Sequence, residues 1–154
     1  MNNWNAITIE TDSQLQRCLA VRREVFIEEQ QVPEELEIDD YDRIGSAAGH
    51  VLLAAEDEDA AAGRFTPYKD GAAKMQRVAV RSAYRGRGVG RLLMESLETA
   101  ARKAGYRSAV LDSQCQAEGF YQSLGYRTVP GEPFYDAGIL HVRMVKEWMD
   151  ADSN

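Results

Sequence analysis

The stretch from Val78 to Leu93 contains residue types whose spacing could hold a phosphate-bearing ligand. Three glycines at alternate positions, Gly86, Gly88 and Gly90, separate an apolar segment from an amphipathic one. Glycine tolerates positive φ and has no Cβ, so alternate glycines allow successive backbone N–H groups to converge on one oxyanion. A helix that follows such a loop adds unpaired N–H groups and the positive end of its dipole. The pattern therefore predicts a pyrophosphate-binding loop.

Four arginines, Arg81, Arg85, Arg87 and Arg91, surround these glycines in a chain whose formal net charge is −7. A local positive patch on an acidic protein suits a small polyanion. The alternative, a solvated start of a helix, is weaker because cations are disfavoured at a helix N-terminus unless an anion sits there. The overall acidity argues against nucleic acid as a partner, since its binding rests on broad basic surfaces.

The spacing separates three ligand classes. A P-loop requires Lys-Ser or Lys-Thr after its glycines, and neither follows here. A dinucleotide loop requires G-x-G-x-x-G and an acidic residue about 20 residues further on, which Asp112 echoes only weakly. The remaining pattern, Arg85-x-x-Gly88-x-Gly90, resembles the R/Q-x-x-G-x-G/A signature of the GCN5-related N-acetyltransferase (GNAT) superfamily. An ordinary strand–helix turn with glycine at its bends remains the alternative for the hexapeptide alone.

The hydrophobic pattern predicts an ordered alternation of strands and helices. A helix capped by Asp12 or Ser13 is expected to end at Pro33, and another is expected from Val89 to Ala104, stopped by Gly105. A shorter helix is expected at 117–124. Strands are expected at 4–10, 50–56, 61–68, 73–80, 108–111, 126–129 and 139–145, with an acidic hairpin turn at 56–59. This order is that of the GNAT fold.

The resemblance extends to a second motif. The segment 114–126 is similar to the family pattern N-x-x-A-x-x-x-Y-x-x-x-G-F, with Ala117, Tyr121 and Gly125 matching, Gln114 in place of asparagine and Tyr126 in place of phenylalanine. Further matches in the segments 25–33, 70–74 and 136–141 resemble the ElaA/YjcF-like bacterial branch. Together they imply a single GNAT domain over 1–154, an α/β fold with a mixed, mostly antiparallel central sheet flanked by helices.

The resemblance also implies the reaction and its site. The protein is expected to be an N-acetyltransferase that uses acetyl-CoA as cosubstrate, with the strand before the loop splayed open to bind the pantetheine arm. Tyr121 would protonate the departing thiolate, although an amphipathic tyrosine of the core is the alternative. The residues implied in binding acetyl-CoA are Val78, Ala79, Val80, Arg85, Gly86, Arg87, Gly88, Val89, Gly90, Arg91 and Gln114.

The sequence does not identify the general base. The strand face before the loop presents Lys74, Gln76 and Val78, none of which is a carboxylate, so either a carboxylate from the first helical region or a water must serve. That region carries a dense acidic run, formed by Glu28, Glu29, Glu34, Glu35, Glu37, Asp39, Asp40 and Asp42. It would suit a cationic amine if it lined the acceptor site, whereas charge runs are usually solvated. His141 lies in a strand expected near the C-terminus. A lone histidine is more often a structural residue, and only the branch resemblance makes it a site candidate, with no role assigned.

Other features set limits. No apolar run approaches the roughly 20 residues of a membrane span and no signal-like N-terminus is present, so a cytoplasmic protein is expected. Cys18 and Cys115 form neither a disulfide framework nor a zinc set, and no metal site is expected. The acceptor is expected to be a small or cationic primary amine, and a homodimer stays open. A coenzyme A-binding sensor without turnover is the rival hypothesis.

Overall fold

The computed structural model describes residues 3–148, so both expected domain boundaries, 1 and 154, lie outside the described residues. One sheet of eight strands forms its centre, with the order β1-β2-β3-β4-β5-β8-β6 and β7 paired to β8. The strands are β1 (Asn5–Thr8), β2 (Gly49–Ala55), β3 (Glu58–Pro67), β4 (Ala72–Val80), β5 (Ser108–Gln114), β6 (Arg127–Thr128), β7 (Phe134–Asp136) and β8 (Ile139–Glu147). Every pairing is antiparallel except β4 with β5. The mixed, mostly antiparallel sheet expected from the sequence is confirmed.

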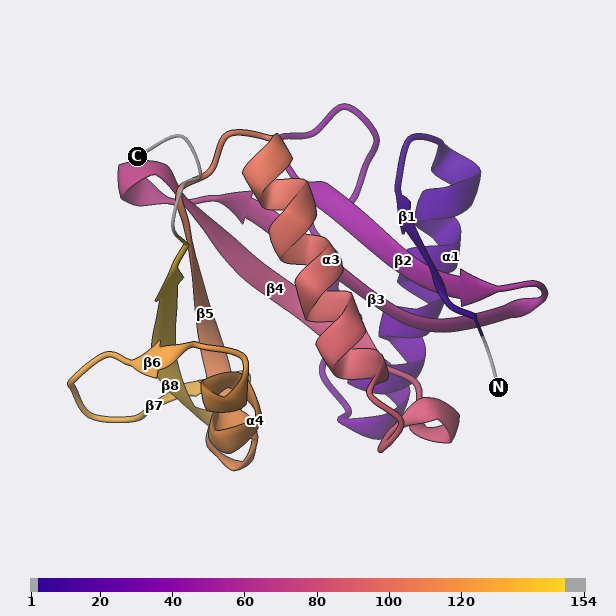
Figure 1. Cartoon of the computed structure of the whole chain (residues 1–154). Helices are drawn as coiled ribbons and strands as arrows, with labels where there is room; N and C mark the ends of the chain where they lie inside the picture. Colours follow the sequence, from indigo (N-terminus) through magenta and orange to yellow (C-terminus); the bar gives the residue numbers. More distant parts are fainter. Residues whose placement is uncertain (1–2, 149–154) are drawn as a thin grey trace.

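Helices lie on both faces of this sheet (Figure 1). They are α1 (Asp12–Arg22), its π-helical continuation η1 (Arg23–Glu29), α2 (Glu34–Glu37), α3 (Val89–Lys103) and α4 (Glu118–Ser123), with short 3-10 turns η2 (Lys69–Gly71), η3 (Ser82–Tyr84) and η4 (Cys115–Ala117). In the part of the chain that the structure describes, no helix is long and apolar enough to cross a membrane.

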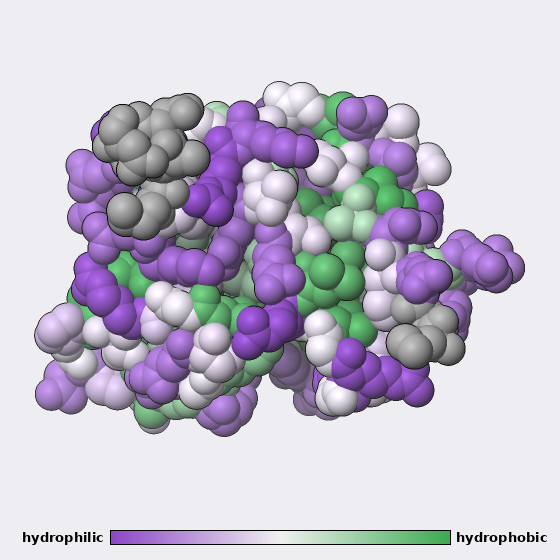
Figure 2. Space-filling view, viewed as in Figure 1, coloured by the Kyte–Doolittle hydropathy of each residue, from purple (hydrophilic) through white to green (hydrophobic). Residues whose placement is uncertain are grey.

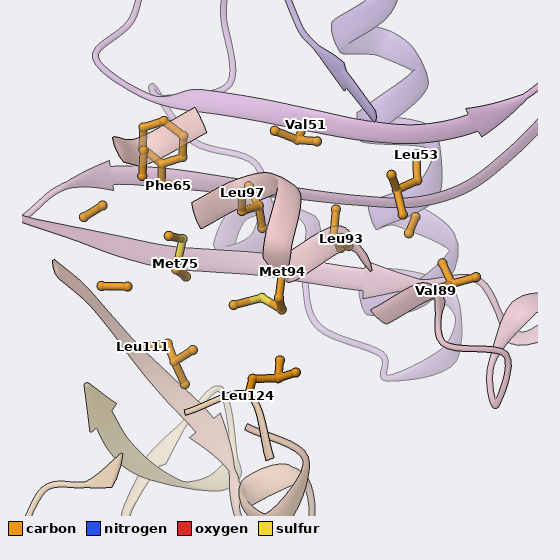
Figure 3. Packing of buried hydrophobic residues seen from close by; sticks show 14 of the residues in the cluster. Val51, Leu53, Phe65, Met75, Val89, Leu93, Met94, Leu97, Leu111 and Leu124 are labelled. Atoms are coloured by element: carbon orange, nitrogen blue, oxygen red, sulfur yellow. The ribbon is translucent and has the colours of Figure 1, made fainter. Parts of the chain in front are cut away.

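The strand period of two divides the core between the two faces. Val51 and Leu53 of β2 pack in the cluster under α3, whereas Leu52 and Ala54 pack in the cluster under α1. Figure 3 shows the α3 side of this arrangement, in which Leu93 and Leu97 of α3 and their neighbours meet side chains from the sheet. Seen from this side, hydrophilic residues cover much of the outer surface around α3, and a hydrophobic area lies to the right of the centre (Figure 2). Burial of one face therefore fixes α3 across the sheet.

The first helical region differs from the expectation at both ends. Thr11, rather than Asp12 or Ser13, caps α1, because its hydroxyl accepts from the backbone N–H of Gln14 and the Gln14 side chain accepts from the Thr11 N–H. This reciprocal arrangement is a capping box. The helical region ends at Glu29, and Pro33 caps α2 instead of ending the first helix.

Two short elements were not expected from the sequence. α2 has only four residues, and β7 has only three that pair with β8 through a hairpin. Neither segment is long enough to show a hydrophobic period, so sequence pattern could not reveal them. The hairpin between β2 and β3 is tighter than expected, because Glu58 and Asp59 already belong to β3.

Candidate functional site

The sheet opens between β4 and β5. Their parallel pairing runs from Ala72↔Ser108 to Met75↔Leu111 and then stops, and the two strands diverge beyond that point (Figure 1). On its other edge β4 carries a bulge, where the register shifts between Ala62 and Arg64 of β3 and Arg77 adopts φ 56°. A bulge bends its strand. The bend at Arg77 accompanies the divergence of the C-terminal half of β4 from β5.

The divergence exposes backbone groups of β4. The Arg81 N–H donates to the Ala60 carbonyl of β3 at 2.9 Å, and Ala79 stands opposite Ala62 in the same ladder. N–H groups alternate in direction along a strand. The N–H groups of Val78 and Val80 therefore point away from β3 and toward the opening, as expected for a splayed strand. The N–H of Ala79, which was also expected to bind acetyl-CoA, faces β3 instead, and its side chain is buried under α1.

A cleft of about 460 Å³ occupies this opening. Side chains from both diverging strands, from η1 and from the β7–β8 hairpin line it. Among the residues singled out in the sequence, it brings together Val78, Val80, Arg85, Gln114, Tyr121 and His141. The glycine loop lies just beyond Arg85, at the start of α3. The two sequence motifs therefore meet at one opening in the sheet.

The glycine loop has the conformation that its sequence predicts. Gly86 and Gly88 adopt φ 77° and 78°, a left-handed region that side chains with a Cβ avoid. A Cβ at either position would meet no protein atom within 4 Å, so the space above the loop is open to a ligand. Gly88 is also the N-cap of α3 and supplies no side-chain cap, which leaves the first N–H groups of the helix free.

Gly90 has a different role from the other two glycines. It lies inside the first turn of α3, and a Cβ there would approach Cζ of Phe120 to 3.3 Å. The absence of a side chain lets α4 pack closely against the start of α3. This glycine therefore serves the contact between two helices as well as the loop.

The four arginines do not form one free patch. Arg81 donates to both carboxylate oxygens of Glu24 at 3.1 Å, and Arg85 makes two contacts with Glu29 and a hydrogen bond of 2.9 Å to the Val80 carbonyl. Arg87 is exposed and forms no ion pair within residues 3–148. The patch expected from the sequence is thus partly neutralised by the first helical region.

Arg91 contacts the α4 end of the site only weakly. Its guanidinium lies 3.5 Å from the Ser123 carbonyl and 3.9 Å from Glu95, and its side chain is half exposed. Both Arg87 and Arg91 therefore keep most of their charge available beside the glycine loop.

Tyr121 reaches the cleft from α4. Its ring makes edge contacts with Phe120 and Tyr126, at centroid distances of 5.0 and 5.9 Å, and packs against the core. Its hydroxyl has no hydrogen-bond partner within residues 3–148, and burial raises the pKa of Tyr121 to about 12. The phenol therefore stays protonated at neutral pH and can act as a proton donor.

Gln114 and a residue missed by sequence reasoning bridge the opening. The Gln114 amide at the end of β5 donates to Oε1 of Gln30 at 3.1 Å and accepts from Gln116 at 2.5 Å. Gln30 follows η1, more than 80 residues away in the chain. Gln30 belongs to the segment 25–33 that resembles the branch, but its contact with Gln114 depends on tertiary structure and could not be predicted from a local pattern.

Three acids of the run, Glu37, Asp39 and Asp42, are paired with arginines, whereas Glu28, Glu34, Glu35 and Asp40 are exposed, as expected of a solvated charge run. Arg22, 1% exposed at its side chain, pairs with Glu37 at 2.8 Å and with Asp42 at 2.6 Å. Burial raises the pKa of Glu37. Burial would also raise the pKa of Asp42, but hydrogen bonds from Arg22 and from the Asp39 backbone hold it below its ordinary value. These carboxylates are neither a solvated face nor a free acidic lining.

Two further arginines complete this ion-pair network. Arg64 pairs with Asp39 at 2.7 Å and with Asp42 at 2.9 Å. Arg77, at the bulge of β4, pairs with Glu37 at 3.2 Å and donates to the carbonyls of Leu36 and Glu37. The arginines Arg22, Arg64 and Arg77 and the acids Glu37, Asp39 and Asp42 therefore balance one another. They fix the segment 34–42 over the bulge.

A second charged cluster lies on the other wall of the cleft. Asp112 of β5 accepts two hydrogen bonds from Arg143 and lies 3.4 Å from Lys74. Arg143 also donates to the Tyr68 hydroxyl at 2.7 Å. Burial would raise the pKa of Asp112, but Arg143 and Lys74 lower it. Two cations share one carboxylate here, so Lys74 brings a surplus positive charge to the cleft.

Comparison with known proteins agrees with this geometry. A family model described as an acetyltransferase (GNAT) domain matches residues 10–148. The uncharacterized N-acetyltransferase YjcF of Bacillus subtilis is 37% identical over 142 residues, covering 92% of this chain and 99% of YjcF, and the uncharacterized protein YyaT of the same organism is 37% identical, covering 93% and 95%. The crystal structure of Escherichia coli ElaA superposes with a TM-score of 0.80 at 32% identity, covering 96% and 100%.

The sheet is open, and a glycine loop lies at the mouth of its cleft. Together with the family model, which matches most of the chain, these features identify an acetyltransferase fold. The chain belongs to the GNAT superfamily. Within that superfamily it falls in the ElaA/YjcF-like branch. The dinucleotide-binding interpretation needs a free acidic residue to bind the ribose, and Asp112 is instead bound to Arg143.

Proposed function

We propose that the protein is an acetyl-CoA-dependent N-acetyltransferase that transfers the acetyl group directly to a small primary amine. The observation that carries this proposal is the cleft between β4 and β5, which joins the glycine loop at one end to Tyr121 and the free N–H groups of β4. GNAT proteins use acetyl-CoA, and the donors present here fit such a ligand.

Each part of the cleft has a role in this proposal. The loop N–H groups, with Arg87 and Arg91, bind the pyrophosphate, and Arg85 holds the loop to η1. The N–H groups of Val78 and Val80 bind the pantetheine arm and polarise the thioester carbonyl. Attack by the amine nitrogen forms the C–N bond and breaks the C–S bond, while the Tyr121 hydroxyl protonates the leaving thiolate.

The charge of the cleft bears on the acceptor. Glu37, the member of the acidic run that lines the cleft, is paired with Arg22 and Arg77, whereas Lys74 adds positive charge. We therefore infer that the acceptor has a small neutral or anionic tail rather than a second cationic group.

Turnover is tested by incubating the protein with acetyl-CoA and matched amines that have neutral, carboxylate or ammonium tails, and by following free thiol. We expect thiol release that depends on the amine and is least with the ammonium tail. Tight binding of acetyl-CoA without release for any amine would instead identify a coenzyme A sensor. Binding of a nicotinamide cofactor in preference to coenzyme A would contradict both.

Gly88→Val is expected to abolish most acetyl-CoA binding in a folded protein. The added side chain would occupy the open space above the loop, and valine strongly disfavours φ 78°. Gly45→Val is the matched control, because Gly45 also has positive φ and open surroundings but belongs neither to the glycine loop nor to the cleft. Calorimetric titration of both variants measures the affinity. Equal affinities in the two variants would place the phosphates elsewhere.

Arg87→Ala is expected to weaken coenzyme A but not pantetheine. The exposed guanidinium has no ion pair to lose within residues 3–148, so its removal takes away only attraction for the phosphates. We expect roughly a tenfold loss for coenzyme A at low salt, since one charge-assisted contact contributes about 1.5 kcal/mol. The loss should shrink as salt is raised. A parallel loss for pantetheine would indicate a packing role.

A further inference from the structure

His141 is a cleft residue to which the proposed function gives no role. It lies on β8 directly opposite Gln114 of β5, and it is 9% exposed. Its ring stacks on Phe134 of β7, with a centroid distance of 6.1 Å and an interplanar angle of 23°. Tyr121 and His141 line the same cleft. The hairpin and the strand therefore hold an imidazole at the wall of the site.

The hydrogen bonding of His141 fixes which nitrogen is free. Nδ1 lies 2.7 Å from the Ile139 carbonyl oxygen. A carbonyl can only accept, so Nδ1 carries the hydrogen and the neutral ring has its lone pair on Nε2. Nε2 has no hydrogen-bond partner within residues 3–148. A neutral imidazole in this tautomer is ready to accept a proton.

The carboxylates of the cleft are less suited to that task. Arg143 and Lys74 lower the pKa of Asp112, which makes it a weaker base. Burial raises the pKa of Glu37, but Arg22 and Arg77 occupy its two carboxylate oxygens at 2.8 and 3.2 Å. Asp136 of the hairpin is exposed, and solvent screens it. The face of β4 offers no carboxylate, so the histidine is the cleft group that combines burial with a free basic atom.

We propose that Nε2 of His141 is the general base of the acetyl transfer. This inference rests on the proposed function. As the amine nitrogen attacks the thioester carbon, one N–H bond breaks and its proton goes to Nε2, while the C–S bond breaks and the Tyr121 proton goes to sulfur. The products are the amide and the free thiol. The imidazolium then returns its proton, through solvent, to the tyrosinate.

The pH dependence of this base is set by the groups that share the cleft. These are Asp136 on β7, Asp112 on β5, Lys74, Arg77 and Arg85 from β4 and its loop, Glu37 on α2 and Tyr121 on α4. Arg143, on the same strand as His141, is bound to Asp112.

The kinetic test compares His141→Asn with Asp136→Asn. The asparagine amide can keep the hydrogen bond to the Ile139 carbonyl while Nε2 is removed, so the hairpin should stay in place. We expect kcat/KM of His141→Asn to fall roughly 10²–10⁴-fold at neutral pH. Asp136→Asn tests the carboxylate of the hairpin and should lose far less activity than His141→Asn. Thermal melting verifies that each variant is folded.

The outcomes separate the two proposals. An active parent with a folded His141→Asn that keeps kcat/KM within threefold of it overturns the base and leaves the acetyltransferase intact. A parent that never releases thiol overturns both. A large loss in Asp136→Asn with none in His141→Asn transfers the role to the carboxylate and contradicts the proposal.

A second measurement does not depend on turnover. The chain has two histidines, and the other one, His50, places Nε2 at 3.1 Å from the Tyr41 carbonyl. The two rings should therefore be opposite tautomers, which ¹⁵N NMR of the imidazoles distinguishes. We expect a protonated Nδ1 and a bare Nε2 in His141. A hydrogen on Nε2 of His141 in the neutral ring would overturn the proposal.

Discussion

Tyr121→Phe is expected to lower kcat by roughly 10²–10⁴ while KM for acetyl-CoA stays close to that of the parent. A proton donated to a leaving thiolate stabilises the transition state and contributes little to ground-state binding. The phenylalanine keeps the ring and its edge contacts with Phe120 and Tyr126. No protein hydrogen bond is lost within residues 3–148, because the hydroxyl has no partner there. Steady-state kinetics with an accepted amine measures the effect.

Tyr126→Phe is the matched control for this experiment. The Tyr126 hydroxyl donates to Glu98 at 2.9 Å and is buried away from the cleft. Its loss should cost stability, about 1–3 kcal/mol for a buried partner left unsatisfied, without a comparable loss of kcat. If Tyr121→Phe turns over like the parent, the tyrosine is a core residue and the thiolate takes its proton from water.

The position of Tyr121 could be predicted only in part. The second motif placed it on a helix stopped by Gly125, and the structure has that helix and a φ of 99° at Gly125. The contacts that hold this helix in place could not be predicted from the sequence. Lys146 of β8 donates to the Leu124 carbonyl and to Glu98, both at 2.8 Å. Such support joins residues far apart in the chain, and single-sequence patterns do not record it.

The same distinction applies across the site. The glycine loop and α3 follow from local chemistry, namely positive φ at Gly86 and Gly88 and one apolar helix face. The charges did not follow from local chemistry. From the sequence, Glu37, Asp39 and Asp42 are expected to be solvated, because no local pattern predicts that Arg22 is buried beside them or that β4 has a bulge at Arg77. The expected positive patch was overestimated for the same reason, since Glu29 reaches Arg85 from another helix.

Asp42→Ala is expected to lower the free energy of unfolding by about 3–5 kcal/mol, the cost of removing one partner from a buried ion pair. The Asp42 side chain is fully buried and lies 2.6 Å from Arg22 and 2.9 Å from Arg64. Its removal leaves two buried guanidinium groups with too little negative charge nearby. Glu147→Gln is the matched control, because its pair with Arg127 is exposed on both sides, so a change below about 1 kcal/mol is expected.

Urea denaturation of the parent and both variants measures these differences, provided that the m-values agree. The pH dependence of the free energy of unfolding gives an independent test of this ion pair. Because the folded protein holds the pKa of Asp42 below its ordinary value, the stabilisation is present above the unfolded pKa of about 3.9 and is lost as pH falls below it. The parent should therefore lose stability below about pH 4 more steeply than Asp42→Ala. Two results would contradict this prediction: equal acid sensitivity of the two proteins, or an unfolding midpoint of Asp42→Ala close to that of Glu147→Gln. Either would mean that the network contributes little to stability and that packing alone holds the segment 34–42 over the bulge.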